Sequence, residues 1–315
     1  MTADPAPAAP APEPAAPSDP AVPSEPVAPS GSTAAPQSRA GRDLPKAIGI
    51  GVGLGAYVVL SLIFFKPAFV LLVAVALVLG SRELHAALRR QGMNAAIVPI
   101  MIGTVGIAIG SYLAGIQRPV VFSTTSVLLG ALALTVLAAL VWRMPGGAHG
   151  YVKDAAASLF IICYVPLLGS FTALMLAGEN GGARLVTFIL VVVMSDTGGY
   201  VFGVLMGKHP MAPRISPKKS WEGLLGSLLF GVVAGICMAV LGLHVPIWIG
   251  VLVGVALVGV GTCGDLVESM IKRDLGIKDM SSFLPGHGGV MDRLDSLLVA
   301  APVAWLIMYV LVPGG

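Results

Sequence analysis

Long apolar runs constrain this chain more than any other feature. They cover about 46–65, 67–88, 95–115, 119–142, 155–177, 183–206, 221–243, 246–263 and 296–312. Each approaches the roughly 20 residues that cross a bilayer as a helix, and a helix satisfies its own backbone groups in lipid. The alternating pattern of a membrane barrel is missing from the sequence. We therefore predict an all-α, polytopic integral membrane protein with about nine transmembrane helices, and we exclude a soluble globular fold.

The positions of Lys and Arg predict the orientation, because basic residues concentrate in cytoplasmic loops. If the N-terminus is cytoplasmic and the nine spans alternate, 16 of the 19 Lys and Arg residues fall on the cytoplasmic side. Only Lys66, Arg118 and Arg184 fall outside. We therefore expect a cytoplasmic N-terminus, an external C-terminus and a location in the cell (plasma or inner) membrane.

The chain divides into three regions. Residues 1–44 are rich in Ala, Pro and Ser, cannot bury enough apolar surface to offset ordering, and are expected to form a disordered cytoplasmic tail. A Pro-rich docking segment is the alternative for this tail. Residues 45–180 hold the N-terminal transmembrane helices. Residues 181–315 form a C-terminal region with two polar cytoplasmic loops, 207–220 and 264–295, where we expect the chemistry.

Glycines recur at close spacing in three of the spans. The first reads GIGVGLG between Gly49 and Gly55, and similar spacing occurs at Gly106 and Gly110 and at Gly250 and Gly254. No strand or later acidic partner supports a dinucleotide loop. Small residues at this spacing favour close packing of transmembrane helices.

The first polar cluster runs from Ser195 to Gly223. Asp196 lies near the middle of a span, where a carboxylate is a functional candidate, although it can also simply bond to a neighbouring helix. The loop that follows carries Lys208, Arg214, Ser216, Lys218 and Lys219 among three prolines that prevent a plain helix. These cations suit a polyphosphate, and ordinary flanking charge is the alternative. Glu222 begins the next helix, where a carboxylate suits the helix dipole.

The second polar cluster, Gly264 to Ser296, holds six of the 16 acidic residues. Asp265, Glu268, Ser269 and Lys272 share one face if the eighth helix continues past Gly264, and Arg273 flanks that face. A Pro/Gly loop, Phe283 to Gly289, follows. Its glycine amides can approach an anion closely. His287 in this loop is either a general acid or base, a donor to phosphate, or neither.

Asp292 and Asp295 open the last helix on one face. Asp265 and Asp292 therefore approach one membrane surface from two helices. Carboxylates beside Lys and Arg fit the binding of Mg²⁺ on a polyphosphate, and structural salt bridges are the alternative.

Together these residues closely resemble the phosphatidate cytidylyltransferase (CDP-diacylglycerol synthase) family of bacterial membranes. That family's signature reads S-x-apolar-K-R-x4-K-D-x-small, then x2-apolar-P-x-H-G-G-apolar-x-D-R-apolar-D. The matching positions are Ser269, Lys272, Arg273, Lys278, Asp279, Ser281, Leu284, Pro285, His287, Gly288, Gly289, Asp292, Arg293 and Asp295. The SDTG and PRISPKKSWEG segments also look like the family, and the resemblance covers roughly the last 120 residues.

The resemblance implies the reaction CTP + phosphatidate → CDP-diacylglycerol + diphosphate, in which the lipid phosphate attacks the α-phosphorus of CTP. It implies Mg²⁺ at one of two cation sites, the second monovalent or divalent, with Asp265, Asp292 and Asp295 as ligands. The implied catalytic residues are Asp265, Asp292, Lys272, Arg273 and His287. The implied substrate-binding residues are Asp196, Arg214, Ser216, Lys218, Lys219, Glu222, Ser269, Lys278, Gly288, Gly289 and Arg293.

The expected partners are CTP and membrane-embedded phosphatidate, with no nucleic acid, in a homodimer whose active site lies on the cytoplasmic face. Two other functions stay open. One is an ion-coupled transporter with Asp196 and Glu83 as coupling sites, although transporters carry such residues at the bilayer midplane on broken helices. The other is a CTP-dependent transferase that acts on a different membrane lipid.

Overall fold

The structure, a computed structural model, describes residues 44–116, 123–281 and 288–313. Most of the predicted tail, together with Arg118, Leu284, Pro285 and His287, therefore lies outside the described residues. In chain order the elements are α1 (Leu44–Phe64), α2 (Lys66–Arg90), α3 (Ile97–Ile116), α4 (Thr124–Arg143), η1 (Met144–Gly146), α5 (Tyr151–Ile162), η2 (Cys163–Leu167), α6 (Leu168–Ala177), α7 (Gly181–Met206), β1 (Pro210–Ala212), β2 (Ser216–Ser220), α8 (Trp221–Met238), η3 (Ala239–Leu243), α9 (Ile247–Asp274) and α10 (Met291–Leu311).

The predicted all-α membrane fold is confirmed. Within the described residues, eight helical segments are long and apolar enough to cross a membrane, with α5, η2 and α6 forming one of them. α1 is a further apolar helix of 21 residues, so a ninth span and the direction of the N-terminus stay predictions. The division near residue 180 also stays a prediction, because residues Arg42–Gly315 form one compact unit.

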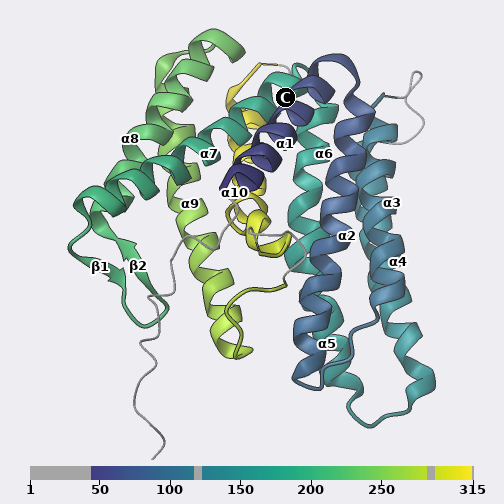
Figure 1. Ribbon diagram of the computed structural model, residues 1–315. Coiled ribbons are helices and arrows are strands. Elements are labelled where there is room, and N and C mark those ends of the chain that lie inside the picture. Colours follow the sequence, from purple (N-terminus) through teal and green to yellow (C-terminus); the bar gives the residue numbers. More distant parts are fainter. Residues whose placement is uncertain (1–43, 117–122, 282–287, 314–315) are drawn as a thin grey trace, which may run out of the picture. The chain divides into compact units, whose positions relative to one another are not determined.

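A short hairpin is the one departure from the helical pattern in the described chain. β1 pairs antiparallel with β2, and Pro210 lies opposite Ser220. The sequence predicted only that the prolines would keep this loop from forming a plain helix. Pairing across the turn at Pro213–Ile215 gives the loop a defined shape beyond the end of α7 (Figure 1).

Glycines bring α7, α8 and α9 into backbone contact. A Cβ built on Gly198 would lie 2.3 Å from the carbonyl oxygen of Gly226, and one on Gly250 would lie 2.5 Å from that of Gly235. The predicted packing role of Gly250 is therefore confirmed. For the glycines from Gly49 to Gly55 and for Gly106 it stays a prediction, because among the described residues nothing lies within 4 Å of a Cβ built at these positions.

Replacing Gly198 by Ala is expected to destabilise the protein by about 1–3 kcal/mol, because the new methyl group would force α7 away from the α8 backbone. Thermal unfolding in detergent measures the effect. Gly130→Ala is the matched control, since nothing lies within 4 Å of a Cβ at this position in α4. Equal unfolding temperatures for the two variants would contradict the packing argument.

Two apolar cores hold the C-terminal helices α7, α9 and α10 against the N-terminal helices. The larger core joins α7, α9 and α10 through buried residues such as Leu185, Leu257 and Ala300. The second joins α2, α3 and α5 to α10, and it includes Leu84, Met291 and Leu298. The α2–α3 and α4–α5 connections and the C-terminal end of α9 lie at one end of the helices (Figure 1). These are connections that the positive-inside rule assigns to one side of the membrane.

Candidate active site

A pocket of about 390 Å³ opens among α7, the hairpin, α8, α9 and α10. Its charged lining residues comprise five carboxylates and four cations. They are Asp196, Asp265, Glu268, Asp292 and Asp295, and Lys218, Lys219, Lys272 and Arg293. All nine come from the two polar clusters that the sequence singled out, so the fold brings segments about 70 residues apart into one site.

α9 supplies one wall of the pocket. It continues past Gly264 to Asp274, and Asp265, Ser269 and Lys272 all line the pocket, as the helical spacing predicted. Gly264 explains the close approach of α10. A Cβ on Gly264 would lie 2.8 Å from the carbonyl oxygen of Asp295, so a larger residue would separate the two acidic helices.

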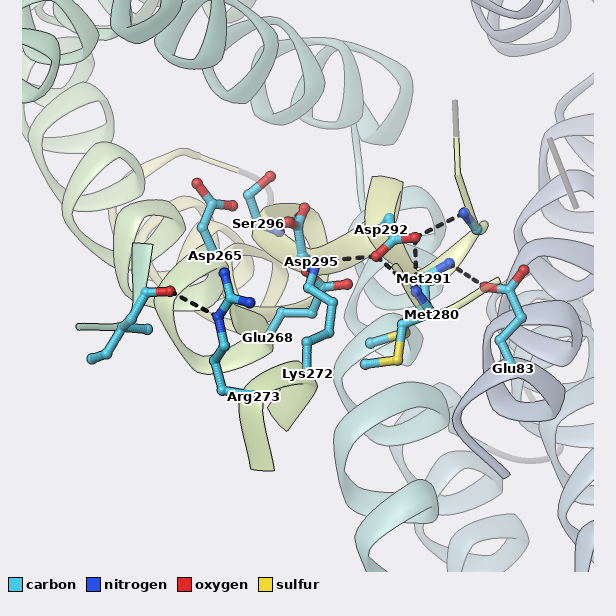
Figure 2. Close-up of polar contacts among 12 residues, drawn as sticks. Glu83, Asp265, Glu268, Lys272, Arg273, Met280, Met291, Asp292, Asp295 and Ser296 are labelled. Atoms are coloured by element: carbon cyan, nitrogen blue, oxygen red, sulfur yellow. Dashed lines mark hydrogen bonds and ion pairs between the residues drawn. The ribbon is translucent and has the colours of Figure 1, made fainter. Parts of the chain in front are cut away.

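Lysines connect the acidic residues of different elements. Lys219 Nζ of the hairpin lies 2.5 Å from Asp265 Oδ2. Lys272 Nζ of α9 lies 3.0 Å from Asp292 Oδ1 of α10 and also forms an ion pair with Glu268. The Glu268 side chain is only 1% exposed. These ion pairs fix the relative positions of β2, α9 and α10 around the pocket, and Figure 2 shows Lys272 between Glu268 and Asp292.

Asp292 also organises the backbone that precedes α10. Its carboxylate accepts hydrogen bonds from the amide nitrogens of Gly289, at 2.8 Å, and Met280, at 3.1 Å. Such charge-assisted bonds are stronger than neutral ones. The side chain is therefore held in one orientation at the pocket wall.

The donor atoms suit a hard cation. Asp196, Asp265 and Asp295 line the same pocket, and the buried Glu268 Oε1 has no hydrogen-bond partner. Among the described residues, no three His, Cys, Asp or Glu side chains are already arranged around one metal position. Mg²⁺ does not need such a cage, because it commonly takes one or two carboxylates and completes its shell with phosphate oxygens and water.

Several predicted site residues lie outside the pocket lining. Arg214 is exposed in the hairpin turn, and Lys278 is exposed in the α9–α10 connection. Arg273 Nε lies 3.4 Å from the carbonyl oxygen of Ile215, so it connects α9 to the hairpin (Figure 2). Glu222 accepts hydrogen bonds from the amides of Lys208 and His209 and pairs with the His209 ring.

Three further predicted residues are part of the frame around the pocket. Ser216 begins β2. Gly288 has a φ of +84°, a backbone conformation that glycine adopts without strain. Gly289 donates its amide to Asp292. Their predicted contacts with substrate stay predictions.

Two acidic residues were missing from the predicted site. The helical spacing places Glu268 on the same face of α9 as Asp265 but does not indicate a role for it, and the structure adds it to the pocket lining. For Glu83, in α2, the sequence suggests only a coupling role in the transporter alternative. It accepts hydrogen bonds from the connection that leads into α10 (Figure 2). A carboxylate within an apolar run was the available signal for Glu83.

Comparisons with known proteins extend the resemblance to the first helices. The model of the "Cytidylyltransferase family" matches residues 45–311. The chain is 41% identical over 291 residues to the phosphatidate cytidylyltransferase of Mycobacterium bovis, which covers 88% of this chain and 92% of that protein. It is 40% identical over 289 residues to that of Mycobacterium leprae, with 87% and 90% covered.

A further relative matches over a shorter part of the chain. The phosphatidate cytidylyltransferase of Staphylococcus epidermidis is 40% identical over 157 residues, which cover 49% of this chain and 59% of the relative. The pocket, the motifs that line it and the match over residues 45–311 agree: this chain belongs to the cytidylyltransferase family.

Proposed function

We propose that this chain is a phosphatidate cytidylyltransferase, which converts CTP and phosphatidate into CDP-diacylglycerol and diphosphate. An oxygen of the lipid phosphate attacks the α-phosphorus of CTP. The bond from that phosphorus to the oxygen bridging to the β-phosphate breaks, and diphosphate leaves. The observation that carries the proposal is the single pocket in which five carboxylates and four cations meet at the ends of membrane helices.

The chain's own cations account for phosphate binding. Lys218 and Lys219 from the hairpin, Lys272 from α9 and Arg293 from α10 all border the pocket. A triphosphate and a lipid phosphate together carry more negative charge than one side chain can neutralise. Because phosphoryl-type transfer depends mainly on positioning and charge neutralisation, cations that reach the pocket from three directions suit this reaction.

Asp265, Asp292 and Asp295 would hold Mg²⁺, and Asp196 is a further candidate. When bound, Mg²⁺ would neutralise charge on the phosphate oxygens and on the departing diphosphate. A second cation site, monovalent or divalent, is part of the proposal. The five carboxylates that share the pocket support both sites, since they outnumber its four cations.

The pocket also borders a surface suited to lipid. Tyr200 lines the pocket and is 71% exposed. Val204 on the same helix and Leu225 on α8 are also exposed, at 66% and 64%. An apolar helix surface beside a charged pocket would let the acyl chains stay in the bilayer while the phosphate enters the site.

We further propose that the enzyme lies in the cell membrane as a homodimer, with this pocket on the cytoplasmic side. The basic residues at the α2–α3, α4–α5 and hairpin connections support that side. CTP would then enter from the cytoplasm. The transporter alternative is less consistent with the contacts, since Glu83 already accepts three hydrogen bonds.

A detergent assay with radiolabelled CTP tests the function. Labelled CDP-diacylglycerol is expected only when CTP, phosphatidate and Mg²⁺ are all present, with release of diphosphate. Chromatography of the lipid product separates phosphatidate from other acceptor lipids. Product formation from another lipid phosphate in preference to phosphatidate would assign a different transferase. Substrate flux in sealed vesicles without CTP consumption would favour the transporter.

A further inference from the structure

A buried carboxylate in the first half of the chain holds the entrance to α10. Glu83 lies in α2 and is 8% exposed. Its Oε1 accepts hydrogen bonds from Ser281 Oγ, at 2.6 Å, and from the Val290 amide, at 3.0 Å. Its Oε2 accepts a hydrogen bond from the Met291 amide, at 2.8 Å. One side chain therefore contacts residues on both sides of the Pro/Gly loop.

α2 contacts the α9–α10 connection at a second point. Gln91, at the end of α2, donates a hydrogen bond from Nε2 to the carbonyl oxygen of Leu275, at 3.1 Å. Leu84 of α2 belongs to the same apolar core as Leu275 and Met291. Polar and apolar contacts therefore hold the start and the end of the connection against one helix.

Gly289 lies between Glu83 and Asp292. A Cβ on Gly289 would lie 2.6 Å from Glu83 Oε2 and 3.1 Å from Asp292 Oδ2. The two carboxylates thus approach the same stretch of backbone from opposite sides. Glu83 accepts hydrogen bonds from the amides of Val290 and Met291, while Asp292 accepts one from the amide of Gly289; Figure 2 shows the Met291 bond to Glu83.

From this arrangement we propose that Glu83 is a positioning residue for the cytidylyltransferase site. It fixes the backbone of Val290 and Met291, and thereby places Asp292 against Lys272 and opposite Asp265. The inference rests on the proposed function, because it assigns Glu83 a role in that same site. Glu83 itself does not line the pocket, so its effect on the reaction passes through Asp292.

The physical reason is that the backbone amides held by Glu83 are next to Asp292 in the chain. Met291 donates to Glu83, and Asp292 is the next residue. Without the carboxylate, buried backbone donors lose their partners, and the start of α10 can shift. A displacement of about 1 Å at a reacting group can lower a rate about 10²-fold.

Glu83→Gln and Glu83→Ala test the proposal in the full-length protein. Gln keeps the shape and one acceptor oxygen, but its NH₂ group would face a backbone or hydroxyl donor. Ala removes all three acceptors. Glu179→Gln is the matched control, because it makes the same chemical change in an exposed residue before α7. Turnover is measured per folded enzyme, alongside amide hydrogen exchange of residues 288–292.

We expect kcat to fall about 10–100-fold in Glu83→Gln, and further in Glu83→Ala, with the KM for CTP changed less than about threefold. Exchange of the 288–292 amides is expected to be at least about tenfold faster than in the Glu179→Gln control. If Glu83→Ala does not fold, the comparison of Glu83→Gln with Glu179→Gln still tests the proposal. A merely structural role would lower the yield of folded protein without changing kcat per folded enzyme.

A kcat within twofold of wild type in folded Glu83→Gln would overturn the proposal. Loss of kcat with unchanged amide exchange would overturn it too, because Glu83 would then not act through the α10 entrance. Failure of the proposed function is distinguishable. In that case wild type itself makes no CDP-diacylglycerol, while the exchange measurement still reports whether Glu83 holds the backbone.

Discussion

Replacing Asp265 by Asn is expected to lower kcat at least about 10²–10³-fold, the range for removing a group that stabilises charge in the transition state. Asp265 lines the pocket together with Asp295 and forms an ion pair with Lys219. Asn has nearly the same shape but no negative charge, so it would bind a cation poorly and leave Lys219 without its ion pair. Turnover of radiolabelled CTP with phosphatidate measures the loss.

Asp274→Asn is the control for this substitution. Asp274 ends the same helix, is exposed, and does not line the pocket. Its variant should keep wild-type turnover, and both variants should reach the membrane in equal amounts. Asp265→Asn with more than half of wild-type kcat would remove Asp265 from the proposed metal ligands.

Replacing Lys272 by Met is expected to lower both activity and stability. Lys272 is 17% exposed and pairs with Glu268 and Asp292, whose side chains are 1% and 9% exposed. Removing one partner of a buried ion pair typically costs about 3–5 kcal/mol, because the remaining charge is uncompensated. Turnover should also fall, because Lys272 is one of the four cations in the pocket. Thermal unfolding in detergent and the CTP assay measure the two effects separately.

A double variant separates the two roles of Lys272. Glu268→Met combined with Lys272→Met removes the buried pair together, which is often close to neutral for stability. The double variant should therefore regain much of the unfolding temperature but none of the activity. Lys66→Met, at the exposed start of α2, controls for loss of a lysine. If Lys272→Met unfolds at the wild-type temperature, the three side chains do not form a buried ion-pair network.

Much of the site could be predicted because helical spacing is regular. Asp265, Ser269 and Lys272 lie on one face of α9, as positions separated by three and four residues must. Asp292 and Asp295 both reach the pocket from the first turns of α10. The apolar runs also matched the helices closely, since in lipid a long apolar segment has little alternative to a helix.

Contacts between distant segments were less predictable. The pairing of Lys219 with Asp265 depends on the hairpin, whereas the sequence indicated only a stiff, basic loop. Glu222 was assigned to substrate but accepts hydrogen bonds from the backbone that leads into that hairpin. A carboxylate near a loop can serve a ligand or the loop itself, and local sequence does not distinguish these uses.

The glycines illustrate the same limit. Gly250 packs against Gly235, whereas the similar glycines of α1 contact no other helix within the described chain. Spacing alone indicates that small residues share one face of a helix. It does not indicate whether another helix packs against that face.

The sequence by itself determined that this protein crosses a membrane, where its helices lie, and most of the charged residues that line the candidate pocket, because hydropathy and helical periodicity are local properties. Only the tertiary structure decided that Glu83 of α2 holds the start of α10 and that a lysine accompanies each of Asp265 and Asp292. Those contacts join residues 20 to 208 positions apart. Packing sets such distances, and no pattern along the chain encodes them.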